Sequence, residues 1–597
     1  MASANVSIGP SRARSPITIH DEFECALEGK ALLNSPHFNK GSAFTVEERR
    51  IFKLDGLLPT AVHSLEQQTK RAYEQYRSYD APIAQNQFLQ SLRDQNEVLF
   101  YRLISDHLKE MLSVIYTPTE GDAIEKYSHL FRRPEGCFLD IEHIDDVDDV
   151  VASCAHPDDI DYIVVTDGEE ILGIGDQGVG SIGISTAKLA LMTLCAGIHP
   201  NRTLGVTLDC GTDNQALLDD ELYLGLRRSR VRGEQYDKFV DTFVKAVQEH
   251  YPKAFLHFED FGLTNARRLL DIYRPQLPCF NDDIQGTGAV TLAAILSAVW
   301  VCKMELKDVR MLIYGAGSAG TGIADQVRDA MVQIGGLTKE DASKRIWLVD
   351  KPGILVSSLG DKLTTGQQPY VRPDDEFHDI DHRDLAQVIR KVKPHVLIGT
   401  STHAGGFTET VVREMARHVD APIIFPLSNP TRLVEARPGD IFTWSDGRAL
   451  IATGSPFEPV EFGGRRYVVA ECNNAIVYPG IGLGCVLSRA STLTDAMLIS
   501  AVHALAAQSP ALQNADSGLL PDVADVRRIS MTIACAVIKT AVEEGVATAQ
   551  GVPADDRELE EWVMGQMWDP VYRTLKKVDA ASASRDAQGK VGSKSSQ

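Results

Sequence analysis

The sequence has no long apolar run, no closely spaced cysteines and no excess of positive charge. No apolar run reaches the roughly 18 residues that a membrane-spanning helix needs, so we expect no membrane segment. No two of the ten cysteines are closer than Cys472 and Cys485, so no CxxC pair exists to bind zinc or form a redox pair, and a reducing compartment is expected. The formal net charge of −22 argues against nonspecific binding to nucleic acid or to membrane surfaces.

What the sequence does have is the length and composition of a globular protein with several domains: 597 residues, 44% hydrophobic and 24% charged. Residues 1–20 hold Arg12 and Arg14 but no acidic residue, a weak likeness to a mitochondrial transit peptide. Because Pro10 and Pro16 interrupt any amphipathic helix there, we predict a disordered tail over residues 1–22. We predict a cytoplasmic protein, with the mitochondrial matrix as the alternative.

Hydrophobic periodicity predicts helices in the first part of the chain and alternating strands and helices after it. We expect a helical N-terminal domain at residues 23–134 and an α/β substrate and metal domain at 135–284, completed by 474–545. A dinucleotide-binding domain at 285–473 and a C-terminal helix with a disordered tail at 546–597 complete the chain. The fold class is therefore α/β: a Rossmann-type doubly wound parallel sheet, a second α/β domain, a helical N-terminal region and a helical C-terminal segment. A capping-box pattern at Thr45 and Glu48 marks the start of one helix.

A glycine-rich motif, Gly315-Ala316-Gly317-Ser318-Ala319-Gly320, follows a predicted strand and opens a predicted helix. Its glycines allow a tight turn, and its backbone N–H groups can approach a pyrophosphate at the helix N-terminus. Asp350 ends the next predicted strand, where a carboxylate can accept hydrogen bonds from the ribose hydroxyls and repels a 2′-phosphate. The motif predicts NAD as cofactor, and the neighbouring Lys351 leaves NADP possible.

Two acidic pairs, Glu259-Asp260 and Asp282-Asp283, each follow a short apolar run that predicts a buried strand. Carboxylates in apolar surroundings are costly unless something pairs with them. A divalent cation such as Mn²⁺ or Mg²⁺ suits oxygen ligands. For either pair alone, helix capping or ordinary ion pairs are an equally good interpretation.

Five further residues are candidates for chemistry or binding. Lys188 opens an apolar helix after a glycine-rich stretch; it can extend its ammonium group to solvent, or act as a general base near a metal. Tyr116, in a turn after an apolar helix, either packs in the core or serves as a general acid. Asn429 and the pair Asn473-Asn474 lie near strand ends, where open α/β sheets bind ligands, although turn asparagines are commonly just exposed.

Together these segments resemble the malic enzyme family over roughly residues 30–575. The segments that carry the resemblance are GLLP (56–59), IYTPTEG, VVTDGE, AKLAL, HFEDFG, FNDDIQGTGAV, YGAGSAGTGIA, LSNPT, GSPF, NNAIVYPG and MWDPVYR. The family oxidatively decarboxylates L-malate to pyruvate and CO₂, using NAD or NADP and Mn²⁺ or Mg²⁺. The resemblance therefore implies a small-molecule enzyme that forms a homo-oligomer, a dimer or a tetramer.

The resemblance also implies a role for each matching residue. Lys188 would be the general base and Tyr116 the general acid. The metal ligands would be Glu259, Asp260 and Asp283, with Asp282 close behind them. Malate carboxylates would be held by Asn429 and Asn474, with Asn473 beside them. The dinucleotide would contact Gly315, Gly317, Ser318, Ala319, Gly320, Asp350, Asp283 and Asn429.

The sequence departs from the family pattern at two places. Glu170 stands where most members have an arginine that pairs with a substrate carboxylate, and Glu471-Cys472 replaces a common Gln-Gly. A glutamate cannot make the bidentate carboxylate contact of an arginine. Two alternatives therefore stay open: a malolactic-type conversion of malate to lactate with bound NAD, or a weakened homologue that only binds a dinucleotide or a dicarboxylate.

Overall fold

The computed structural model describes residues 22–155, 159–429 and 431–579. The predicted disordered tails therefore lie almost wholly outside the described residues. The first part of the chain is helical, as predicted, and Thr45 and Glu48 form the expected capping box at the start of α2. Its helices are α1 (Gly29–Leu33), α2 (Val46–Ile51), α3 (Leu65–Tyr76), α4 (Pro82–Gln95), α5 (Glu97–Asp106), α6 (Leu108–Ile115), α7 (Thr119–Glu125) and α8 (Tyr127–Leu130).

The first sheet is wholly parallel, with strand order β2-β4-β3-β5-β6. Its strands are β2 (Cys137–Asp140), β3 (Tyr162–Thr166), β4 (Thr203–Asp209), β5 (Phe255–Phe258) and β6 (Cys279–Asn281). Alternate side chains enter different cores: Tyr162 and Val164 pack on one face, Ile163 and Val165 on the other. Both faces are covered, as expected for a parallel sheet.

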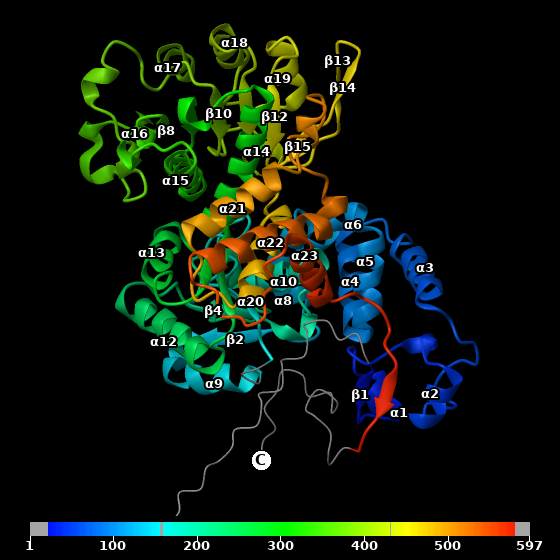
Figure 1. The fold of residues 1–597 in the computed structure, drawn as a ribbon. Helices are drawn as coiled ribbons and strands as arrows, with labels where there is room; N and C mark the ends of the chain where they lie inside the picture. The colour runs from blue at the N-terminus through cyan, green and yellow to red at the C-terminus, as the bar shows by residue number, and fades with distance from the viewer. Residues whose placement is uncertain (1–21, 156–158, 430, 580–597) are drawn as a thin grey trace, which may run out of the picture.

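Helices from distant parts of the chain cover this sheet (Figure 1). The face of Tyr162 packs with α10 (Ile182–Ala196), α20 (Tyr478–Ser488) and α22 (Val526–Glu543). The opposite face packs with α9 (Val147–Cys154), α12 (Glu234–His250) and α13 (Leu263–Tyr273). The C-terminal part of the chain therefore returns to the first sheet, while the domain limits given above stay a prediction.

The second sheet has the order β15-β12-β11-β10-β7-β8-β9, parallel except for the short edge strand β9. Its strands are β7 (Met311–Tyr314), β8 (Ile346–Asp350), β9 (Gly353–Ile354), β10 (Val396–Gly399), β11 (Ile423–Pro426), β12 (Leu450–Thr453) and β15 (Ala470–Glu471). The chain runs outward from β7 to β9 and then starts again at β10 on the other side of β7. This confirms the doubly wound sheet, with a crevice at the carboxyl ends of β7 and β10.

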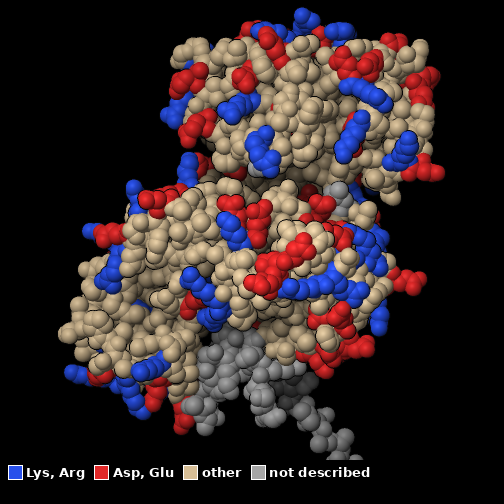
Figure 2. Space-filling model, turned by 180° about the vertical axis from the view of Figure 1, so that it is seen from behind, with Lys and Arg blue, Asp and Glu red and all other residues tan. Residues whose placement is uncertain are grey.

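Two helical layers sandwich this sheet in the upper lobe of Figure 1. One contains α14 (Thr287–Val301) and α15 (Ser318–Gln333), and the other α17 (Leu385–Val392), α18 (Glu409–His418) and α19 (Pro438–Trp444). α21 (Asp495–Ala506) packs between α14 and α22, where the two lobes join (Figure 1). On the face seen in Figure 2, acidic and basic side chains are interspersed, and a recess separates this lobe from the lower one.

Three features of the structure differ from the sequence analysis. The C-terminal segment is not only a helix followed by a tail, because after α23 (Asp556–Gln566) the chain forms β16 (Leu575–Lys577), which pairs in parallel with β1 (Phe23–Cys25). A hairpin of β13 (Val460–Phe462) and β14 (Arg465–Tyr467) was also not predicted. Finally, two helical segments, Gly178–Ala196 and Asp282–Val301, are long and apolar enough to cross a membrane. They are 89% and 83% buried inside the protein, which is typical of core helices, so their length is weak evidence for a membrane.

Candidate active site

The two acidic pairs meet at the carboxyl ends of neighbouring strands. Glu259 and Asp260 follow β5, and Asp282 and Asp283 follow β6 in the π-helical turn Asp282–Gly286. Because β5 and β6 are adjacent and parallel, the two pairs come together. Carboxylate oxygens of Glu259, Asp260 and Asp283 all lie within 4.8 Å of one another. The structure thus brings together the three acids predicted to bind metal.

The backbone at Asp260 is shaped to support this cluster. Its φ of 53° lies in the left-handed region, which non-glycine residues adopt rarely and often at functional sites. In this conformation the Asp260 N–H donates to Oδ2 of Asp283 at 2.9 Å, and Oδ2 of Asp260 accepts from the Leu172 N–H at 3.3 Å. The acids are therefore held by the backbone as well as by strand pairing.

Lys188 reaches the same cluster from α10. It is 1% exposed, and its Nζ lies 2.9 Å from Oε1 of Glu259 and 2.5 Å from Oδ2 of Asp282. Of the two interpretations given above, extension of the ammonium group to solvent is therefore wrong. Burial opposes the charged form, but Asp282 and Glu259 outweigh it and raise the pKa of Lys188 well above its usual value.

Two aromatic rings enclose the lysine. Its Nζ lies 5.4 Å from the ring centroid of Tyr116 and 5.1 Å from that of Tyr478. Tyr116 directly follows α6 and is buried, and burial raises the pKa of its phenol. The structure thus places the predicted general acid beside the predicted general base.

The charge of the cluster is not balanced by the described protein groups. Burial, reinforced by neighbouring carboxylates, raises the pKa of Asp260 well above its usual value and that of Asp283 to about 8. Oδ1 of Asp282 is buried and has no hydrogen-bond partner among the described residues. The carboxylates of Asp260 and Asp283 are in mutually repulsive surroundings, and the buried oxygen beside them is without a partner. Such an arrangement fits a divalent cation.

The three predicted asparagines have different environments. Nδ2 of Asn474 donates to Oδ2 of Asp282 at 3.1 Å and to Oγ1 of Thr287 at 3.1 Å, so Asn474 lies at the cluster. Asn473 instead caps the short helix Asn474–Ile476 through the Ala475 N–H, and its Nδ2 donates to Glu471. Among the described residues, no hydrogen bond joins Asn473 to the acidic pairs Glu259-Asp260 and Asp282-Asp283.

Asn429 lies in the loop after β11, and its Oδ1 accepts from the Ser455 hydroxyl. The backbone carbonyl oxygen of Asn429 faces Gly173 in the glycine-rich loop that precedes α10. A Cβ atom built on Gly173 would lie 3.8 Å from this oxygen. Asn429 is therefore on the upper lobe where it approaches the lower one, and its side chain is exposed.

The glycine-rich motif has the predicted strand–turn–helix context between β7 and α15, which begins at Ser318. Gly315 has a φ of 111°, and a Cβ there would be 2.5 Å from the backbone of Thr400. At Gly320 a Cβ would collide with the Gly315 carbonyl, whereas at Gly317 it would meet nothing within 4 Å. The turn thus leaves open space at Gly317 for a phosphate group to approach. Asp350 ends β8, the strand beside β7, as predicted.

Sequence reasoning missed His257. Its Nε2 lies 2.6 Å from Oε2 of Glu259, and its Nδ1 lies 2.9 Å from the Tyr162 hydroxyl. It holds one Glu259 oxygen while Lys188 holds the other. Side chains two residues apart on a strand lie on the same face. A histidine two residues before Glu259 in an apolar strand therefore indicates a contact between the two side chains.

Glu170, the unusual residue at the arginine position, lies at the edge of the site. Its N–H donates to the carbonyl of Asp260 at 3.3 Å, and its side chain is exposed. Burial of part of the carboxyl group, with Glu169 and Asp167 nearby, raises its pKa. It adds a further acid to an already acidic region.

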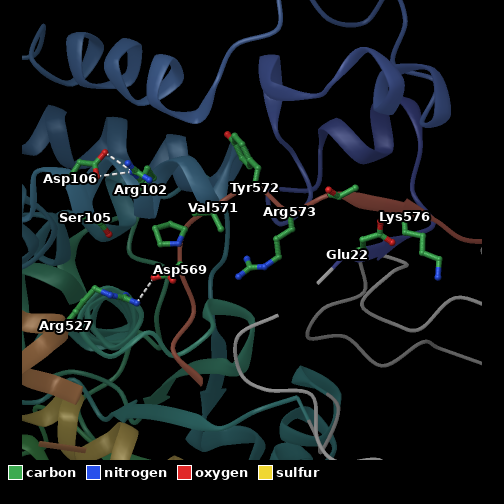
Figure 3. A pocket seen from close by; sticks show the side chains of 12 residues that line it. Glu22, Arg102, Ser105, Asp106, Arg527, Asp569, Val571, Tyr572, Arg573 and Lys576 are labelled. Carbon is green, nitrogen blue, oxygen red and sulfur yellow. Dashed lines mark hydrogen bonds and ion pairs between the residues drawn. The ribbon is translucent and has the colours of Figure 1, made fainter. Parts of the chain in front are cut away.

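A separate cavity of about 1020 Å³ lies between α5, the start of α22 and residues 569–576 (Figure 3). Arg102 pairs there with Asp106, and Arg527 pairs with Asp569. No residue predicted to act in catalysis, metal binding or dinucleotide binding lines it.

Two family models match this chain. Residues 93–274 match the family model "Malic enzyme, N-terminal domain", and residues 284–542 match "Malic enzyme, NAD binding domain". The chain is 52% identical to "NAD-dependent malic enzyme, mitochondrial" of Saccharomyces cerevisiae over 94% of its length and 85% of that protein. It is 49% identical to "NAD-dependent malic enzyme" of Schizosaccharomyces pombe, over 94% of its length and 99% of that protein.

Solved structures show the same fold. The malic enzyme of Entamoeba histolytica superposes with a TM-score of 0.54 at 21% identity, covering 86% of this chain and 90% of the other. That of Pyrococcus horikoshii superposes with a TM-score of 0.52 at 21% identity, covering 77% and 89%. From the sequence matches, the chain belongs to the malic enzyme family.

Proposed function

We propose that this protein oxidatively decarboxylates L-malate to pyruvate and CO₂ with reduction of NAD, and that it requires Mn²⁺ or Mg²⁺. The relatives that are about half identical to it are named NAD-dependent malic enzymes. The observation that carries the proposal is a buried lysine, Lys188, in contact with both acidic pairs at the carboxyl ends of a parallel sheet. A buried lysine, a neighbouring phenol and a cation-type acid cluster suit oxidation of an alcohol followed by loss of CO₂.

Glu259, Asp260 and Asp283 would hold the cation, and Asp282 would support them through Lys188 and Asn474. When bound, the cation supplies charge stabilisation at the C1 carboxylate and C2 oxygen, and the dinucleotide supplies the hydride acceptor. Lys188 accepts the proton of the C2 hydroxyl as the hydride leaves C2. For this step the lysine must be neutral. The acids that stabilise its charged form, Asp282 and Glu259, must therefore interact with another positive charge.

After CO₂ leaves, Tyr116 donates a proton to C3, which gives pyruvate. Lys188 takes one proton from the hydroxyl, and C3 gains one proton, so the two steps balance. A lysine and a tyrosine in contact can therefore return the proton within the site, without exchange with solvent. The burial of both side chains suits such a closed transfer.

Asn474 and Asn429 would orient the two malate carboxylates from the two lobes. Gly315, Gly317, Ser318, Ala319, Gly320 and Asp350 would hold the dinucleotide. Asp350 favours NAD over NADP because its carboxylate repels a 2′-phosphate. Steady-state rates with NAD⁺ and NADP⁺ at equal concentration test this preference.

Glu170 favours a second candidate, conversion of malate to lactate with bound NAD. Incubation with malate, NAD⁺ and Mn²⁺ separates the two: NADH with pyruvate supports the first, and lactate without net NADH supports the second. If neither cofactor supports turnover of malate in the presence of Mn²⁺, the protein is a binding homologue and the enzyme proposal fails.

We further propose that the chain forms a homo-oligomer, a dimer or a tetramer, which light scattering of the purified protein tests. For location, we propose the mitochondrial matrix in place of the cytoplasm predicted above. The Saccharomyces relative is named mitochondrial, and residues 1–20 carry two arginines and no acid. Fluorescent fusions with and without residues 1–21 decide between the compartments.

A further inference from the structure

Glu435 is a buried carboxylate without a cationic partner among the described residues. It is 0% exposed and lies just after the short helix Thr431–Leu433. Its Oε1 accepts from the N–H of Ser401 at 2.9 Å, from the Ser401 hydroxyl at 2.9 Å and from the Ser428 hydroxyl. Its Oε2 accepts from the N–H of Ser428 at 3.3 Å. One carboxylate thus satisfies four donors on two loops.

The two loops follow β10 and β11 at the crevice of the second sheet. Thr400, beside Ser401, donates its hydroxyl to the carbonyl of Gly315 at 2.8 Å, so the first loop contacts the dinucleotide turn. Ser428 directly precedes Asn429, so the second loop carries the asparagine expected at the substrate. The two loops also meet directly, because the Thr402 N–H donates to the Ser428 hydroxyl at 2.8 Å.

An unpaired buried anion is costly, and packing alone does not require it here. A carboxylate offers what a glutamine side chain does not: both of its oxygens accept hydrogen bonds, and it has no N–H group that would be directed at the surrounding donors. The end of β10 is shaped around it, since a Cβ on Gly399 would collide with the Glu435 side chain. The charge therefore has a role at this position beyond filling space.

Building on the proposed function, we propose that Glu435 is a positioning residue that fixes the dinucleotide turn relative to Asn429. It sets the distance between the nicotinamide end of the cofactor and the malate carboxylate held by Asn429. It touches neither, and acts through Ser401 and Ser428.

The test compares Glu435→Gln with Glu414→Gln. Glu414 is also buried, at 3% exposed, and is also hydrogen-bonded, to Arg390, Arg417 and His418, but it lies on α18 away from the crevice. We expect Glu435→Gln to weaken NADH binding, measured by fluorescence, about tenfold and to raise the KM for malate, because the amide nitrogen faces donors. Glu414→Gln should leave both within about twofold, whatever its melting temperature.

Ser428→Ala provides the second measurement, and it removes one donor without removing the carboxylate. If Ser428 acts through Glu435, its effect on NADH binding must largely disappear in the Glu435→Gln background. Additive effects, or normal NADH binding and KM in a folded Glu435→Gln variant, overturn the proposal. If Glu435→Gln does not fold, Ser401→Ala and Ser428→Ala must each weaken NADH binding. NADH binding also decides this question if the wild-type protein fails to oxidise malate.

Discussion

Nζ of Lys188 lies 2.5 Å from Oδ2 of Asp282, and both side chains are buried. This pair joins α10, which packs on the first sheet, to the turn that leads from β6 into α14. Since α14 belongs to the layer that covers the second sheet, the lysine sits where the two α/β regions join. The three acids proposed to hold the cation, Glu259, Asp260 and Asp283, have carboxylate oxygens within 4.8 Å of one another beside this pair.

Lys188→Ala is expected to lower the rate of NADH production by about 10² to 10⁴-fold, the usual contribution of a general base. The KM for NAD should change little, because the lysine contacts the acids and not the glycine-rich turn. Stopped-flow absorbance of NADH formation measures the rate, and NADH fluorescence confirms that the variant still binds dinucleotide. Normal NADH production by Lys188→Ala would remove it from the base role.

Mn²⁺ is expected to raise the melting temperature of the wild-type protein, because a ligand that binds only the native state stabilises it by mass action. Asp283→Asn should abolish most of this shift, since it removes one of three clustered carboxylates. Asp209→Asn is the control: Asp209 ends β4 and accepts from the N–H groups of Gly211 and Leu226. An equal Mn²⁺ shift in Asp283→Asn and Asp209→Asn would place the metal elsewhere.

Two glycines of the dinucleotide turn should respond differently to alanine. Gly315→Ala is expected to destabilise the fold by roughly 1–3 kcal/mol, because φ is positive and the Cβ meets the Thr400 backbone. Gly317→Ala has open space in the protein and should keep the wild-type melting temperature, yet lose NADH affinity at least tenfold as the methyl group blocks the phosphate. Calorimetry and NADH titration of both variants check this, and tight binding by Gly317→Ala contradicts the assigned approach of the pyrophosphate.

Glu170→Arg is expected to lower the KM for malate severalfold. The N–H of Glu170 bonds to Asp260, so an arginine side chain there can extend over the acid cluster and pair with a substrate carboxylate. Glu170→Gln separates loss of repulsion from gain of attraction, and should lie between the two. An unchanged or raised KM in Glu170→Arg means that another group already neutralises that carboxylate.

The sequence was sufficient where local pattern and strand adjacency determine the outcome. The turn at Gly315 needs no tertiary information beyond its flanking strand and helix. Glu259 and Asp283 were each predicted to follow a buried strand, and the family resemblance implied that they share a metal site; the pairing of β5 with β6 brings them together. The strands β1 and β16 could not be predicted, because three-residue edge strands are defined by a partner at the opposite end of the chain.

Side-chain roles at the site were harder to predict than positions. Asn473 and Asn474 are adjacent and identical, yet only Asn474 reaches Asp282, because Asn473 is the cap of a helix that begins one residue later. The burial of Lys188 depends on Tyr478, which lies almost 300 residues further along the chain. Such contacts depend on which helices cover which face, and that information is not local.

Glu120, on α7 one turn after Tyr116, should make the stability of the protein depend on pH. It is 4% exposed and accepts from Nδ2 of Asn86. Burial raises its pKa to about 7, although Asn86 and Arg93 oppose the shift. In the native protein the carboxyl therefore keeps its proton at pH values where the unfolded chain has lost it. This contribution is complete below pH 4.5 and is lost as the pH rises to about 7.

The free energy of unfolding of the wild type, relative to Glu120→Gln, is therefore expected to fall by roughly 1–3 kcal/mol between pH 5 and pH 8. The amide cannot ionise, so the variant lacks this slope. Urea unfolding at several pH values measures the difference. Glu125→Gln, an exposed position on the same helix, serves as the control and should follow the wild type. If Glu120→Gln and the wild type keep a constant difference over this range, Glu120 does not carry a proton in the native protein near neutral pH.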